Sequence, residues 1–89
     1  MSVPDAFLSA YFAIPLGTST GTSGNRRYVV SRTSLANGKS HKLVAHELGG
    51  GDYISLNLYL TKNSGALLRP CEMSEAKVVE FITSFAPGM

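Results

Sequence analysis

The sequence lacks the residues that several protein classes require. It contains a single cysteine, Cys71, and no tryptophan, so an intrachain disulfide and a zinc cluster built from cysteines are both excluded. No apolar run approaches the roughly 20 residues that a transmembrane helix needs. Asp5 stands before the first apolar stretch, where a signal peptide carries basic residues instead. We therefore expect a cytoplasmic protein that has no membrane partner.

Catalytic signatures are missing as well. His41 and His46 lie five positions apart, which places them on opposite faces of a strand and prevents them from sharing a metal ion. Ser74 and Lys77 match the S-x-x-K spacing of serine hydrolases, but the partner motifs of that class are absent and Ser74 is better placed to cap a helix. The glycine-rich segment 17–24 lacks the Lys-Ser/Thr ending of a phosphate-binding loop. We expect no enzymatic activity, no metal and no cofactor.

The composition is that of an ordinary globular domain. The chain has 89 residues, of which 44% are hydrophobic and 16% are charged. A chain of this length buries roughly 60% of the surface that it exposes when unfolded, which is enough for one small core. We therefore predict a single domain over residues 1–89.

The formal net charge of +2 hides an uneven distribution. Residues 26–69 hold seven basic and two acidic side chains, whereas the remainder of the chain holds one basic and four acidic ones. The basic part is predicted to form strands and the acidic part to include a helix, so positive charge is expected on the sheet. Simple solvation of strands and turns would account for the basic residues equally well.

A β-hairpin is predicted over residues 26–48. The segment RRYVVSRTS is rich in β-branched and aromatic residues, the Asn37-Gly38 pair suits a tight turn, and HKLVAHEL forms the returning strand. Three consecutive glycines, 49–51, then interrupt the chain. Two further strands, separated by the turn KNSG, are expected over Tyr53–Thr61 and Ala66–Cys71.

The N-terminal quarter has a weaker pattern. Phe12, Ile14 and Leu16 alternate with smaller or polar residues, which favours a strand over Ala10–Leu16. A helix over Pro4–Phe12 is the alternative. The segment 17–24 contains three glycines and five hydroxyl residues, so it is expected to be a mobile loop.

The C-terminal segment SEAKVVEFITSFAPG predicts a helix. Ser74 offers an N-cap oxygen, and Pro87-Gly88 ends the run. Its apolar stripe is wider than one sheet face can cover, so we predict a homodimer with contacts near Val78, Phe81 and Phe85. The predicted fold is α+β: an antiparallel sheet of four or five strands followed by this one helix.

The strand over Tyr53–Thr61 has two different faces. Its aliphatic row must face a core, because side chains alternate along a strand, and the other row contains Tyr53, Ser55, Asn57 and Tyr59. Rings interleaved with arginines suit single-stranded nucleic acid, where the rings stack on bases and the cations contact phosphates. The predicted nucleic-acid-binding residues are Arg26, Tyr28, Arg32, Tyr53, Asn57, Tyr59 and Arg69. The alternative is that the tyrosines pack across the strands and that another protein, a second subunit or the N-terminal segment covers their face.

A family resemblance points the same way. The basic hairpin RRYVVSRTSLANGKSHKLVAHEL and the segment GALLRPCEMSEAKVVEFI, a strand ending in proline and followed by an acidic helix start, resemble the transcriptional positive-coactivator domains that bind single-stranded DNA. The plant Whirly proteins are relatives of these domains in fold. The resemblance spans residues 26–82 and implies a dimer formed through its helices and a nucleic-acid site on a curved sheet. The sequence departs from the family by an extra strand and by the glycine-rich segment.

Overall fold

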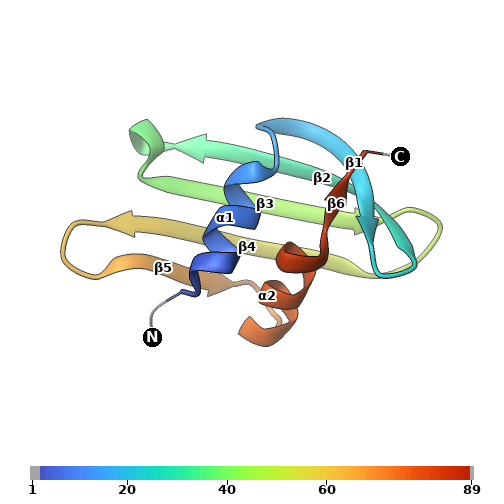
Figure 1. Cartoon of the computed structure of the whole chain (residues 1–89). Coiled ribbons are helices and arrows are strands. Elements are labelled where there is room, and N and C mark those ends of the chain that lie inside the picture. Colours follow the sequence, from blue (N-terminus) through green and yellow to red (C-terminus); the bar gives the residue numbers. More distant parts are fainter. Residues whose placement is uncertain (1–2, 89) are drawn as a thin grey trace.

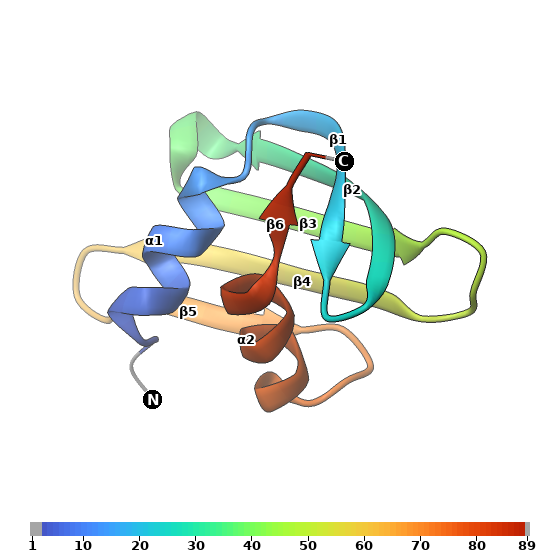
Figure 2. The same cartoon turned by 45° about the vertical axis from the view of Figure 1, so that its right-hand side comes forward.

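The computed structural model describes residues 3–88. In chain order its elements are α1 (Asp5–Ala13), β1 (Gly17–Ser23), β2 (Arg26–Leu35), the short 3-10 helix η1 (Ala36–Gly38), β3 (Ser40–Glu47), β4 (Tyr53–Thr61), β5 (Gly65–Pro70), α2 (Glu75–Ser84) and β6 (Ala86–Pro87). The strands form one antiparallel sheet in the order β5-β4-β3-β2-β1-β6. Both helices lie on the same face of this sheet (Figures 1 and 2).

The predicted α+β class with an antiparallel sheet is therefore confirmed, but the predicted count of elements is wrong. Residues 3–88 form six strands and two helices instead of four or five strands and one helix. The additional elements are α1 at the N-terminal end, β1 in the glycine-rich segment and the two-residue β6 after α2. Neither helix within this range is long and apolar enough to cross a membrane.

Helix α1 occupies the segment for which a strand was the first interpretation. The strand over Ala10–Leu16 is wrong and the alternative, a helix beginning near Pro4, is confirmed. Phe7 and Tyr11, four residues apart, are both fully buried because this spacing puts them on one side of a helix. The helix ends at Ala13, and the next residue, Ile14, has the extended backbone that a following proline favours.

The glycine-rich segment is a strand and not the predicted mobile loop. All seven residues of β1 pair with β2, because ladder hydrogen bonds use the backbone and need no apolar side chain. At one position, Gly21, glycine is required for a steric reason. A Cβ added at Gly21 would collide with the Phe85 ring and with the backbone oxygen of Ala86, so glycine allows the end of α2 and β6 to lie directly on β1.

The three remaining long strands follow the sequence predictions closely. The hairpin of β2 and β3 is confirmed, with η1 in its turn and Asn37 and Gly38 both at positive φ. Strand β4 has the predicted bounds, and β5 is displaced by one residue from the predicted one. The aliphatic row of β4 faces the helices: Ile54, Leu56 and Leu58 are buried, while Leu60 at the end of the strand stays partly exposed.

Helix α2 is capped as predicted, since the Ser74 hydroxyl accepts a hydrogen bond from the Lys77 amide at 3.1 Å. Its wide apolar stripe, however, is covered within the protomer. Val78, Phe81 and Phe85 are all buried, because the stripe meets the sheet on one side and α1 on the other. The ground for predicting a dimer at these three residues is thereby lost, because the second surface that covers the stripe is α1 of the same protomer and not a second copy.

Candidate nucleic-acid interface

The sheet has one face covered by the helices and one that no element of residues 3–88 covers (Figures 1 and 2). The strand register shows which side chains belong to the uncovered face, which we call the open face. None of its members is buried. From β1 to β5 they are Thr18, Thr20, Thr22, Arg27, Val29, Ser31, Thr33, Leu35, Ser40, Lys42, Val44, His46, Tyr53, Ser55, Asn57, Tyr59, Thr61, Leu67 and Arg69.

Charge is distributed unequally between the two faces. The charged side chains of the open face within the strands are Arg27, Lys42 and Arg69, all of them basic. The one acidic residue of the strands, Glu47, pairs with Tyr28 on the covered side. A surface with cations and no strand carboxylate attracts anionic groups.

Four of the predicted nucleic-acid-binding residues lie together on this face. Tyr53, Asn57 and Tyr59 follow one another along β4, and Arg69 of β5 is the direct neighbour of Asn57. Tyr53 is 36% exposed and Tyr59 is 39% exposed. This part of the predicted set is therefore accessible to a ligand.

Asn57 also belongs to a line of polar residues that crosses the sheet. Its neighbour on β3 is Lys42, and Thr33 of β2 is next to Lys42. Neighbouring strands are about 4.8 Å apart, so consecutive members of the line are adjacent. We call Thr33, Lys42, Asn57 and Arg69 the polar row. Lys42 was not among the predicted binding residues, although the alternation in HKLVAHEL puts it on the face opposite the aliphatic row.

The other three predicted residues are not on the open face. Arg26, Tyr28 and Arg32 lie on the side of the helices, and Tyr28 and Arg32 are only 3% and 8% exposed. The error concerns the register of β2. Each of its two alternating rows of side chains contains one valine, so hydrophobicity alone does not show which row is buried. The buried row is Tyr28, Val30, Arg32. A strand shifted by one residue exposes the opposite set.

Arg32 is buried because α1 surrounds its guanidinium group. The group lies 5.1 Å from the ring centres of both Tyr11 and Phe12, an arrangement in which aromatic faces stabilise a cation. One of its terminal nitrogens donates a hydrogen bond to the Ile14 carbonyl oxygen at 2.8 Å. Arg32 therefore holds the end of α1 against the sheet and does not reach a phosphate on the open face.

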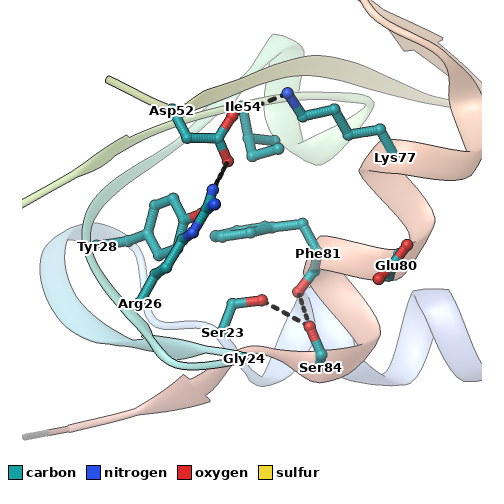
Figure 3. Close-up of a pocket in the computed structure, with 10 residues that line it drawn as sticks. All are labelled: Ser23, Gly24, Arg26, Tyr28, Asp52, Ile54, Lys77, Glu80, Phe81 and Ser84. Carbon is teal, nitrogen blue, oxygen red and sulfur yellow. Dashed lines mark hydrogen bonds and ion pairs between the residues drawn. The ribbon is translucent and has the colours of Figure 1, made fainter. Parts of the chain in front are cut away.

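Arg26 and Tyr28 line a pocket of about 350 Å³ beside α2 (Figure 3). The Tyr28 hydroxyl donates to one oxygen of the Asp52 carboxylate at 2.8 Å, and the Lys77 ammonium donates to the other at 2.9 Å. Arg26 lies 3.8 Å from the same carboxylate and 3.9 Å from that of Glu47. The cations of this pocket thus face carboxylates of the same protein.

This network affects the titration of its members. The hydrogen bonds from Lys77 and Tyr28 lower the pKa of the Asp52 carboxyl below its ordinary value. Burial raises the pKa of the Tyr28 phenol, and its bond to Asp52 raises it further. Glu80 adds another carboxylate to the pocket lining. The pocket is therefore poorly suited to a phosphate, and its contacts serve to attach α2 to the sheet.

The two histidines lie on opposite faces, as predicted. His41 is buried beneath α1, with its ring 5.1 Å from that of Phe12, whereas His46 is exposed on the open face. Within residues 3–88, no group of three or more His, Cys, Asp or Glu side chains is arranged to hold a metal ion.

Comparison with known proteins gives no relative for this fold and site. No family model matches the chain, and neither a curated protein nor a solved structure shows significant similarity to it. The resemblance to positive-coactivator and Whirly domains thus depends on the residue pattern of 26–82 alone and stays a prediction.

Proposed function

We propose that the protein binds single-stranded nucleic acid on the open face of its sheet. The observation that carries this proposal is that two exposed tyrosines share a face with Lys42 and Arg69, while no strand carboxylate lies on that face. Stacking of a base on an aromatic ring contributes roughly 1–3 kcal/mol, and basic groups beside the ring hold the phosphates. The proposal includes the expected cytoplasmic location.

Single strands fit this face better than duplexes do. In a duplex the faces of the bases are stacked on each other, so a tyrosine ring reaches them only where the strand is unpaired. The amide of Asn57 and the hydroxyls of Thr33 and Ser55 would then donate to or accept from base edges and sugars. Arg26, Tyr28 and Arg32 make no direct contact in this proposal, since they belong to the covered side.

The test is a titration of a labelled single-stranded oligonucleotide, followed by fluorescence anisotropy at two salt concentrations. Binding should weaken steeply with salt, and Lys42→Ala should reduce the slope of log K against log salt by about 0.7, the value for one phosphate contact. Lys62→Ala is the matched control, because it removes the same charge from the turn between β4 and β5. Absence of binding at low salt, or equal effects of the two variants, would contradict the proposal.

A protein interface on the same face is the second candidate. Leu35, which is 53% exposed, and Leu67 flank the row of Tyr59, and apolar side chains beside an exposed ring are typical of protein contacts. Such an interface would depend little on salt, so the same titration distinguishes the two candidates.

A further inference from the structure

The two tyrosines of the open face have different surroundings. They are six residues apart on β4 and therefore separated by about 20 Å. The Tyr53 hydroxyl donates a hydrogen bond to the Glu72 carboxylate at 3.2 Å, whereas Tyr59 has no hydrogen-bond partner for its hydroxyl among residues 3–88. The bond to Glu72 raises the pKa of Tyr53. One end of the open face thus carries a carboxylate and the other does not.

Glu72 is fixed in this position by the backbone around it. It is the second residue after β5 and has a positive φ of 62°. The preceding Cys71 amide still donates to the Ser55 carbonyl oxygen of β4 at 2.9 Å. The carboxylate forms no ion pair within residues 3–88. The Lys77 ammonium also acts on Tyr53, but it is already bonded to the Asp52 carboxylate at 2.9 Å. A phosphate approaching Tyr53 would therefore meet the unpaired negative charge of Glu72.

The basic residue nearest to this end within the strands is Arg27, and it lies too far away to offset Glu72 at Tyr53. Tyr53 is the neighbour of His46, which in turn is the neighbour of Val29. Arg27 precedes Val29 by two residues on β2. Two strand spacings across the sheet and two residues along it therefore separate the backbone of Arg27 from that of Tyr53, a distance above about 10 Å.

Tyr59, in contrast, lies beside the polar row. Asn57 precedes it by two residues on the same strand, about 7 Å away on the same face. Lys42 and Arg69 are both diagonal neighbours of Tyr59, one on each adjoining strand. A diagonal separation of about 7–8 Å is within reach of long side chains, so cations lie on both sides of this ring.

From this asymmetry, and given the proposed function, we propose that the nucleic-acid site has one defined end: it includes Tyr59 and stops short of Tyr53. The single-stranded nucleic acid crosses β3, β4 and β5 along the polar row, and one of its bases stacks on the ring of Tyr59. Glu72 keeps phosphates away from Tyr53, so Tyr53 contributes no stacking in the wild-type protein. The ligand is therefore a short single-stranded segment that runs across the β-strands and not along them.

The first test compares Tyr59→Ala with Tyr53→Ala in the anisotropy titration. The loss of one stacked base should lower the affinity by about 5- to 150-fold for Tyr59→Ala. For Tyr53→Ala the change should stay below about twofold, the limit for a side chain outside the contact. Tyr59→Phe keeps the ring and should bind like the wild type, which separates stacking from a general disturbance of the fold.

The second test removes the negative charge with Glu72→Gln. This variant should bind more tightly than the wild type, and in its background Tyr53→Ala should cost affinity that it does not cost otherwise. Glu80→Gln is the matched control, since it removes the same charge from α2 on the covered side and should increase the affinity less.

Two kinds of failure are distinguishable. If the wild type binds the oligonucleotide but both tyrosines contribute equally, or if the two glutamate variants behave alike, the defined end is wrong and the proposed function stands. If the wild type binds no oligonucleotide at low salt, both proposals are overturned.

Discussion

The two faces of the sheet use the same residue types for opposite purposes. On the covered side, Tyr28 and Arg32 are buried and bonded to Asp52 and the Ile14 carbonyl. On the open face, Tyr59 and Arg69 are exposed beside other polar groups. A tyrosine or an arginine therefore indicates little by itself about binding. The register of the strand decides whether such a side chain stabilises the fold or is available to a ligand.

The largest expected difference between the faces concerns aromatic residues. Phe81→Ala should lower the free energy of unfolding by about 3–5 kcal/mol, because it removes a buried ring that contacts Tyr28 and Phe85. Tyr59→Ala should change it by less than about 0.5 kcal/mol. Urea unfolding followed by circular dichroism measures both, and a similar loss for the two would show that the open face is part of the structural core.

The arginines provide the next comparison. Arg32→Ala should destabilise by about 2–3 kcal/mol, since it removes a charged hydrogen bond to a buried carbonyl and the contact with two rings. Arg69→Ala should leave stability almost unchanged and instead reduce the salt slope of oligonucleotide binding by about 0.7. Thermal unfolding and the salt titration together test this pair. The reverse result, with Arg69 stabilising and Arg32 affecting the slope, would contradict the assignment of the faces.

A smaller effect is expected from single hydroxyl groups. Tyr28→Phe should cost about 1–2 kcal/mol, because the Asp52 carboxylate loses a part-buried donor. Tyr53→Phe removes a hydroxyl whose bond to Glu72 is exposed and longer, so it should cost less than about 0.5 kcal/mol. Chemical denaturation of the two variants in parallel is the measurement, and equal costs would count against the distinction.

The smallest expected effect concerns the way in which the stability of the protein depends on pH in acid. The pKa of Asp52 is lower in the folded protein than its ordinary value of 3.8, so the stability that it contributes is complete above that value. This contribution is lost as the pH falls from there through the folded pKa. Asp52→Asn should therefore reduce the loss of stability between about pH 5 and pH 2. An unchanged acid dependence in the variant would show that the network with Lys77 and Tyr28 is not formed in solution.

The sequence was sufficient to predict an element of the fold where one residue pattern dominated the segment. Alternation of four aliphatic residues with polar ones predicted β4 to the residue, and Ser74 indicated the start of α2. It failed where the determining contact is distant in sequence. The strand at Gly17–Ser23 depends on the Phe85 ring above Gly21, and the burial of Arg32 depends on rings in α1. The open face was half predicted, because the register of β4 was clear and that of β2 was not.

The short strand β6 has a consequence for the edges of the sheet. It pairs with Gly21 and Thr22 of β1, and the Gly88 amide adds a hydrogen bond to the Thr20 carbonyl at 2.8 Å. An unpaired edge is a template on which another chain can add a strand. Removal of residues 86–88 would uncover the middle of β1, where threonine, serine and glycine offer neither charge nor bulk to resist such pairing. By pairing with β1, these few residues thus protect its edge from pairing with another chain, a protection that the side chains of β1 do not provide.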